Sequence, residues 1–384
     1  EPDYYSRLKK SDPAYQFAKP LYTPHAKFGW VQTPDNEGIY RGFRYPRAEF
    51  RTRVRINRSG FRSSSEYTVD PKKLRVAVLG DSFVQALQVK EEDSFPKVVE
   101  RLLKARGCDA FVYNFGVSST GTIHQYQILK EAVLKVRPQV LVLAFFPNDL
   151  TDDSPYYVHE DPNLIPQYSL TADGRVDLQD FGGQKDGQSV LQNYVLPRKE
   201  GASWAEKWML EMDKAGARWP FLKSLRFIPA VLNERFTPKN FYSAHVDVYK
   251  KVYPPALAGS LKVTLYFLEE IQRLCRAEGV ELLVVLVPAL EQVDRPMWDQ
   301  FLDERKGYLS GDDFDLERPN RVIGEELGRR GIRYLDLLPS FRKEFWPSRF
   351  YYGQDQHWNA AGHRKAGTII EKYLGENFLR PPGR

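Results

Sequence analysis

The sequence predicts an α/β protein, a three-layer α/β/α sandwich around a parallel sheet. Residues 74–79, Leu-Arg-Val-Ala-Val-Leu, have the mainly apolar pattern of a buried strand of the kind found in parallel sheets. The segment that follows, from Ser94-Phe95-Pro96 to Gly107, has apolar residues at helical spacing. This order of strand and then helix recurs, and three such steps within roughly 75 residues are typical of a parallel sheet covered by helices.

The remaining elements of the sandwich continue the same alternation. A strand at 110–115 precedes a helix at 124–136 that ends before Pro138, and a strongly apolar strand follows at 140–146. After a long interruption, the sequence predicts a helix at 261–277, a strand at 281–287, a helix at 318–330, a strand at 332–338 and a last helix at 360–374.

Two segments lie outside this alternation. Residues 1–70 are rich in Tyr, Pro and Arg and predict a small β-containing extension, because residues 50–56 alternate strictly between apolar and polar. Residues 151–255 are rich in Asp, Gly, Tyr and Pro, with one helical stretch near 204–215, and predict a lid-like insertion. The expected organisation is therefore an extension at 1–70, a catalytic domain at 71–150 and 256–384, and an insertion at 151–255.

Composition excludes several classes of function. The chain of 384 residues has 56 Lys and Arg against 50 Asp and Glu, a net charge of only +6, and no zinc-finger or RNA-binding signature, so we expect no nucleic-acid partner. No His, Asp or Glu cluster calls for a metal, and no cofactor is predicted. Cys108 and Cys275 allow one disulfide or none. The oligomeric state stays open.

Nothing in the sequence predicts a transmembrane segment. The most apolar run, residues 140–146, is far shorter than the roughly 18 residues that span a bilayer. The chain begins with Glu, which suggests that a leader or anchor was removed, although a cloning choice would look identical. Localisation is therefore open, with an extracytoplasmic location favoured.

Four segments lie where strands of the predicted sheet end. Loops at that edge of an open parallel sheet meet in a crevice, so their side chains should lie close together. The segments are Gly80-Asp81-Ser82, the small-residue loop at 114–121, Pro147-Asn148-Asp149, and Asp355-Gln356-His357-Trp358-Asn359 before the last helix.

These segments supply the parts that acyl transfer from an ester needs: a nucleophile, a base, a group that orients the base, and donors for the oxyanion. Their identity and order resemble those of the SGNH or GDSL-like hydrolase superfamily, over roughly residues 54–150 and 255–375. The resemblance implies an SGNH-hydrolase (flavodoxin-like) fold, Ser82 as nucleophile, His357 as general base and Asp355 as its orienting group. It also implies that Asn148 and the Ser82 N–H bind the oxyanion.

The resemblance departs from the family pattern at two places. The second block usually has Gly as its oxyanion residue, whereas an ungapped reading puts Ser119 there and Gly121 two positions later, so either one is a candidate. The late block usually separates Asp from His by two residues, whereas one residue separates Asp355 from His357. This Asp-x-His-Trp form is similar to that of alginate-type polysaccharide O-acetyltransferases.

Other polar residues have simpler interpretations. His363 and His124 are expected to be structural. Arg51 and Arg53, with Arg55, share the polar face of the strand at 50–56; a solvated face explains them, and the alternative is that they, with Arg41, Arg44 and Arg47, bind an anionic or long carbohydrate.

Together these features predict a serine-dependent esterase that acts on an ester or acetylated saccharide. The alternatives are a polysaccharide O-acetyltransferase that uses the same triad, and a non-catalytic carbohydrate-binding or assembly protein on the same fold.

Overall fold

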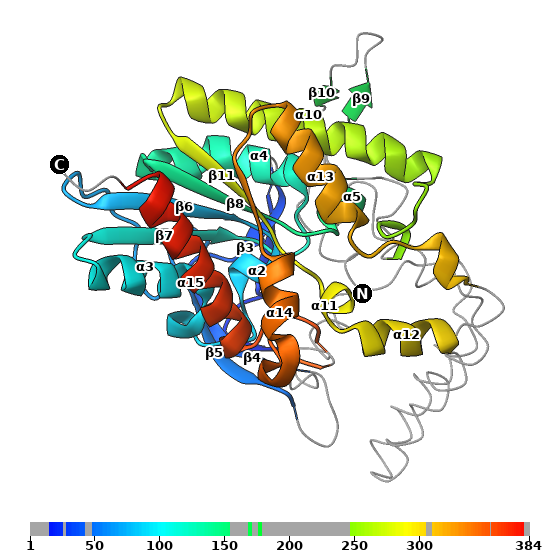
Figure 1. Ribbon diagram of the computed structural model, residues 1–384. Helices are drawn as coiled ribbons and strands as arrows, with labels where there is room; N and C mark the ends of the chain where they lie inside the picture. Colours follow the sequence, from blue (N-terminus) through cyan, green and yellow to red (C-terminus); the bar gives the residue numbers. More distant parts are fainter. Residues whose placement is uncertain are drawn as a thin grey trace, which may run out of the picture.

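A parallel sheet of five strands forms the centre of the protein, with helices on both faces (Figure 1). The computed structural model describes residues 15–25, 28–42, 48–153, 168–170, 176–178, 246–304, 309–353 and 355–379. The predicted helix near 204–215 and most of the predicted insertion lie outside these residues. The sheet has the order β12-β11-β8-β6-β7, and its strands are β6 (Leu74–Gly80), β7 (Ala110–Gly116), β8 (Val140–Phe145), β11 (Glu281–Leu286) and β12 (Tyr334–Asp336).

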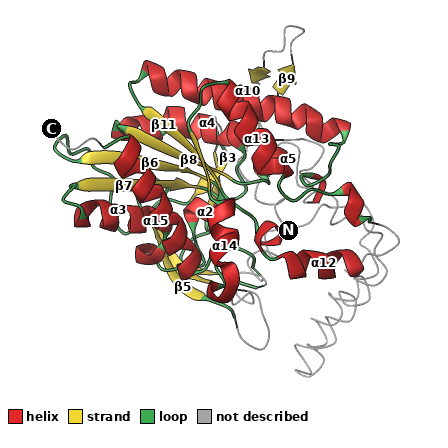
Figure 2. Ribbon diagram, viewed as in Figure 1, coloured by secondary structure: helices red, strands yellow, loops and turns green. Residues whose placement is uncertain are grey.

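Two layers of helices cover the sheet, as Figure 2 shows, and the α/β/α prediction is confirmed. Alternate side chains of β6 pack in two separate cores, Ala77 and Leu79 on one face of the sheet and Val76 and Val78 on the other. The first face is covered by α4 (Thr122–Glu131), α10 (Pro255–Ala277) and α13 (Arg318–Arg329), and the second by α3 (Phe95–Ala105), α14 (Leu338–Ser348) and α15 (Ala360–Asn377).

The strand order places a crevice beside β6. The chain leaves β6 through α3 to reach β7 on one side, whereas it leaves β8, on the other side of β6, through α10 on the opposite face. Ligand sites of open parallel sheets form at the carboxyl ends of strands where the connections diverge in this way. The loops after β6 and β8, which hold Ser82 and Asn148, therefore meet at the same crevice.

Short antiparallel sheets precede the main domain. The first joins β1 (Tyr15–Phe17), β4 (Asn36–Arg41) and β5 (Arg51–Ile56), and the second is a hairpin of β2 (Tyr22–His25) and β3 (Gly29–Gln32). Residues 52, 54 and 56 of β5 are buried and 51, 53 and 55 are exposed, as the alternation predicts. Trp30 joins one core of the main sheet, so the hairpin packs directly on the α/β domain.

Several boundaries differ from those that the sequence predicts. Helix α10 begins at Pro255 rather than at residue 261, because Pro is accepted in the first turn of a helix. The strand expected at 332–338 is only β12, because Asp336 accepts a hydrogen bond from Leu338 N (2.9 Å) and α14 starts there. The helix expected at 124–136 ends at Glu131, and a 3₁₀ turn, Val133–Val136, follows before Pro138. Two further short strands, β9 (Tyr168–Leu170) and β10 (Val176–Leu178), pair within the predicted insertion.

Candidate active site

Ser82 opens a tight turn at the carboxyl end of β6. It is the first residue of α2 (Ser82–Gln85), and the Asp81 carboxylate accepts a hydrogen bond from Phe83 N at 2.9 Å, which caps this turn. Only Gly fits at position 80, before Asp81, because a Cβ there would lie 2.8 Å from the Ala144 carbonyl oxygen. The turn therefore holds Ser82 close against β8.

Three side chains predicted from the sequence form a continuous hydrogen-bonded chain. His357 Nε2 lies 2.8 Å from Ser82 Oγ, and His357 Nδ1 lies 2.8 Å from Asp355 Oδ1. An ionised carboxylate only accepts hydrogen bonds, so the neutral imidazole carries its proton on Nδ1 and offers the Nε2 lone pair to the serine hydroxyl. The geometry suits proton transfer from Ser82 to His357.

The loop that presents His357 is held from several directions. Tyr352 N donates to the His357 carbonyl (2.9 Å). Gln356, which lies between Asp355 and His357, adopts a left-handed φ of 65°. Asp355 N donates to the Glu49 carboxylate at 3.0 Å. No sequence pattern points to Glu49, which lies 306 residues away from its partner Asp355.

Burial and charge act in opposite directions on the His357 imidazole. Burial lowers its pKa, but the hydrogen bond and charge of Asp355, together with the charge of Asp81, outweigh burial and raise the pKa above the usual 6.5. Burial also raises the pKa of Asp81 to about 6, and that of Asp149 well above its usual range. A raised imidazole pKa makes His357 a stronger base for the serine proton.

The oxyanion candidates occupy different places. Asn148 and Ser119 line the same cavity as Ser82 and His357. Gly121 does not: a Cβ there would lie 2.4 Å from Asp153 Oδ1, because Gly121 packs against the carboxylate that accepts from Ile123 N in the first turn of α4. The structure thus brings Ser119, and not Gly121, to the cavity wall.

The Asn148 side chain is oriented by α5 (Asp149–Asp152). Its amide Nδ2 donates to Asp152 Oδ2 at 3.0 Å, and a carboxylate acceptor requires that the amide nitrogen face it. One amide hydrogen is used in this way. The second N–H of the same nitrogen remains available to a ligand in the cavity.

The cavity beside Ser82 has a volume of about 410 Å³ and mainly apolar walls. Besides Asp355, a second carboxyl lines the cavity: Glu291, in α11 (Leu290–Val293), accepts a hydrogen bond from Tyr249 Oη at 3.0 Å, and burial raises its pKa. The sequence analysis did not identify Glu291. The apolar wall includes Phe83, Phe146, Val246, Val248, Leu290, Met297, Trp298 and Phe301, several of them from α11 and α12 (Arg295–Asp303).

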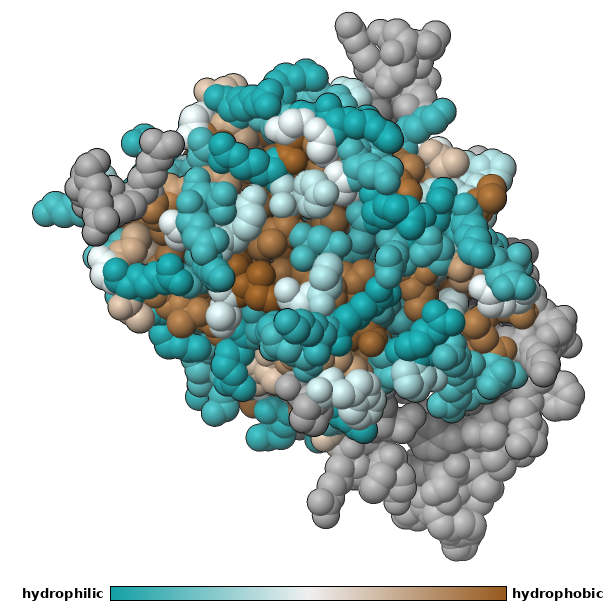
Figure 3. Space-filling view, in the orientation of Figure 1, coloured by the Kyte–Doolittle hydropathy of each residue, from teal (hydrophilic) through white to brown (hydrophobic). Residues whose placement is uncertain are grey.

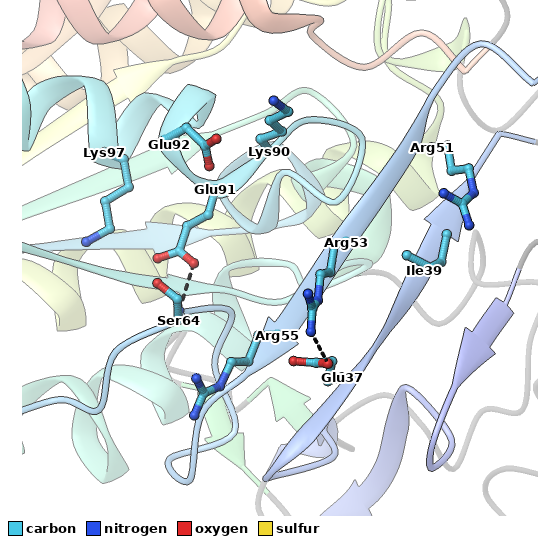
Figure 4. A pocket seen from close by; sticks show the side chains of 10 residues that line it. All are labelled: Glu37, Ile39, Arg51, Arg53, Arg55, Ser64, Lys90, Glu91, Glu92 and Lys97. Atoms are coloured by element: carbon cyan, nitrogen blue, oxygen red, sulfur yellow. Dashed lines mark hydrogen bonds and ion pairs between the residues drawn. The ribbon is translucent and has the colours of Figure 1, made fainter.

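The predicted carbohydrate-binding arginines lie apart from this cavity. Arg51, Arg53 and Arg55 line a second hollow of about 780 Å³ between β5 and the chain that leads into α3 (Figure 4). Arg53 pairs with Glu37 at 2.6 Å. The other lining residues are Ile39, Ser64, Lys90, Glu91, Glu92 and Lys97. Arg44 and Arg47 lie outside the described residues.

His124, His363 and Cys275 are buried, whereas Cys108 is partly buried. His363 is buried, its Nδ1 accepts from Phe95 N at 3.3 Å, and burial lowers its pKa to about 3, so it is neutral. The His124 ring lies 4.9 Å from the Trp30 ring. Cys108 and Cys275 contact opposite cores of the sheet and carry free thiols.

The molecular surface is polar over most of the face in Figure 3, with apolar side chains showing between helices. Within the described ranges, no helix is long and apolar enough to cross a membrane. The same ranges contain no group of three His, Cys, Asp or Glu placed to hold a metal ion.

Comparison with known proteins gives matches among solved structures only. No family model matches the sequence, and no curated protein sequence matches it. The acetyl xylan esterase AlAXEase is 12% identical with a TM-score of 0.40, over 78% of this chain and 99% of its own. TesA is 11% identical with a TM-score of 0.40, over 79% and 98%. A lipase/acylhydrolase from Enterococcus faecalis is 13% identical with a TM-score of 0.38, over 81% and 99%.

Proposed function

We propose that this protein is a serine esterase of the SGNH or GDSL-like type that works through an acyl-enzyme on Ser82. The observation that carries the proposal is the hydrogen-bonded chain from Asp355 through His357 to Ser82 Oγ, at the wall of a cavity. Nucleophile, base and orienting group in this relation are the arrangement that activates a serine hydroxyl.

The proposed reaction has two steps. His357 Nε2 takes the proton of Ser82 as Oγ attacks the ester carbonyl, and the Ser82 and Ser119 N–H groups and the Asn148 amide stabilise the oxyanion. When the tetrahedral intermediate collapses, the protonated His357 returns the proton to the leaving alcohol. Water, deprotonated by His357, then attacks the acyl-enzyme and releases the acid and Ser82.

The direct test is covalent labelling. A fluorophosphonate should modify the wild-type protein on Ser82, and p-nitrophenyl acetate should be hydrolysed. Ser82→Ala and His357→Ala should lose both reactions, whereas Ser59→Ala, a change of an exposed serine outside the site, should lose neither. Wild-type protein that is neither labelled nor active would favour the non-catalytic alternative. Activity that survives in both Ser82→Ala and His357→Ala would exclude the mechanism.

The acyl group and its acceptor form the finer part of the proposal. We propose an O-acetyl ester of a saccharide as substrate and water as the acceptor. The apolar wall suits the methyl of an acetyl group as well as longer acyl chains, so a series of p-nitrophenyl esters from acetate to octanoate tests the acyl preference. A rate that rises steadily with chain length would argue against acetyl.

A polysaccharide O-acetyltransferase is the alternative, on the strength of the Asp-x-His-Trp form. Trp358 is fully buried and packs edge-on against Phe83, with ring centroids 5.1 Å apart. Phe83 lines the cavity beside Ser82 and Trp358 does not, so Trp358 supports the wall of the site from behind. Incubation with an acetyl ester and oligosaccharides, followed by mass spectrometry, decides the matter: free acetate supports the esterase, and acetylated sugar as the main product supports the transferase.

We further propose that Arg51 and Arg53 bind an anionic stretch of the carbohydrate outside the catalytic cavity. Phe50, at the start of β5, packs on Tyr352 with ring centroids 5.0 Å apart, so the arginine row begins beside the loop of His357. Arg51→Glu with Arg53→Glu should weaken binding of an oligouronate and leave hydrolysis of p-nitrophenyl acetate unchanged. Arg276→Glu, a reversal of an exposed charge on α10 outside the hollow, is the matched control. Unchanged oligouronate binding in the double variant would remove this proposal.

A further inference from the structure

One peptide group joins the candidate oxyanion donor to the N-terminal hairpin. The peptide between Ser118 and Ser119 contributes the N–H of Ser119, and its carbonyl oxygen accepts a hydrogen bond from Trp30 Nε1 at 3.1 Å. In a trans peptide the C=O and the N–H point in opposite directions. Fixing the carbonyl on one side therefore fixes the direction of the N–H on the other.

The Ser119 N–H needs such an external restraint. Ser119 has a left-handed φ of 59°, a conformation that costs a residue with a side chain roughly 1 kcal/mol or more. Among the described residues, no hydrogen-bond acceptor faces this N–H. The turn is thus strained, and its free donor belongs to a residue on the cavity wall beside Ser82.

A second restraint ties the same turn to the helix of the nucleophile. Gln85, the last residue of α2, is fully buried, and its Oε1 accepts from Ser118 N at 3.2 Å and from Tyr22 Oη at 2.9 Å. The Ser118 N–H can only donate, which fixes the orientation of the Gln85 amide. The turn and Ser82 are therefore held in one frame, with Trp30 and Tyr22 of the hairpin as outer supports.

We infer that Trp30 is a positioning residue for catalysis: its indole N–H holds the Ser118 carbonyl so that the Ser119 N–H is aimed at the oxyanion. This inference rests on the esterase function proposed above and deepens it, because it makes the N-terminal hairpin part of the catalytic apparatus. A hydrogen bond to the carbonyl also polarises the peptide group, which strengthens the donor at its other end.

The test removes the indole N–H and keeps an aromatic ring. Trp30→Phe should lower kcat about 10-fold to 100-fold with KM unchanged, because loss of one oxyanion donor costs about 10²-fold to 10³-fold and misdirection costs less. The affinity for a trifluoromethyl ketone, which forms an oxyanion on Ser82, should fall by a similar factor. A purely structural role would lower the melting temperature without changing either quantity.

A matched control comes from the middle of β7. Tyr113 Oη donates to the Thr68 carbonyl at 2.6 Å, so Tyr113→Phe also removes a hydrogen bond from an aromatic side chain to a backbone carbonyl, away from Ser119. It should leave kcat and ketone affinity at wild-type values. Gln85→Met, which keeps the side-chain length and removes the acceptor, should reproduce the fall in kcat and replaces Trp30→Phe if that variant does not fold.

The outcomes separate this inference from the proposed function. Wild-type protein that neither hydrolyses esters nor reacts with a fluorophosphonate defeats the esterase proposal, and the inference with it. Active wild-type protein together with a folded Trp30→Phe or Gln85→Met of wild-type kcat and ketone affinity overturns the inference alone. A fall in kcat that is matched by the fall in ketone affinity, and absent in Tyr113→Phe, supports it.

Discussion

Replacement of Gly116 by Ala should damage both stability and catalysis, because Gly116 lies against the backbone of the nucleophile's helix. A Cβ at this position would lie 2.1 Å from Gln85 N and 2.5 Å from the Val84 carbonyl carbon. Both are backbone atoms, so no side-chain rotation relieves the overlap. To reach ordinary contact distance, α2 would have to move by more than about 1 Å away from β7.

Such a shift displaces Ser82 relative to His357. A misplacement of about 1 Å costs about 10²-fold in rate, and overpacking of this kind costs about 1–3 kcal/mol of the free energy of unfolding. Gly259→Ala, in the second turn of α10 with nothing within 4 Å of the added Cβ, should instead stabilise the protein by up to about 1 kcal/mol. Urea unfolding measures the stability of the two variants, and kcat on p-nitrophenyl acetate measures their catalysis. A Gly116→Ala protein with wild-type kcat and wild-type stability would refute the reasoning.

Three further results are expected. Asn148→Ala should lower kcat by about 10²-fold with little change in KM, as steady-state kinetics on p-nitrophenyl acetate would show, and an unchanged kcat would exclude Asn148 from the oxyanion site. His357 must be neutral to act as a base and its pKa is raised, so kcat/KM should fall as pH drops through a value above 6.5. Asp355→Asn should move this fall in kcat/KM to lower pH and reduce kcat by up to about 10⁴-fold. A pH profile that does not move in the variant would contradict the role of Asp355. Burial lowers the pKa of His363 to about 3, so between that pH and 6.5 the unfolded chain binds more protons than the folded protein, and the free energy of unfolding decreases as pH falls. His363→Gln should remove about 1.4 kcal/mol per pH unit of this decrease between pH 6 and 4, as urea unfolding at a series of pH values would show. The same dependence on pH in the variant and the wild-type protein would contradict this expectation.

The elements that the sequence predicts well are those with strong local signals. The apolar strands β6, β7, β8 and β11 form within a residue or two of the expected bounds, because a strand buried on both faces needs a nearly continuous apolar run. Helix α14 was missed, because its apolar residues follow a short strand and the boundary depends on the Asp336 side chain, which accepts a hydrogen bond from Leu338 N, the first residue of the helix.

Some residues of the candidate site were predictable from the sequence, and others depend on tertiary contacts. Ser82, Asn148 and His357 lie at strand ends or before a helix, and topology alone brings such positions to one edge of a sheet. The choice between Ser119 and Gly121 could not be made from sequence, because it depends on the packing of Gly121 against Asp153, which is far from it in the chain. Glu49 and Gln85 were invisible for the same reason, since their partners are set by tertiary contacts.

The three residues Asp355, His357 and Ser82 are separated by very different lengths of chain, and this has a consequence for folding. Asp355 and His357 are two positions apart, whereas His357 and Ser82 are separated by 275 residues. The acid and the base can therefore meet as soon as their own loop forms, but the nucleophile joins them only after the whole sheet has closed the long loop between them. During refolding, esterase activity should return with the last cooperative phase rather than with the early gain of helix. Recovered activity would thus serve as a sensitive report of completed folding.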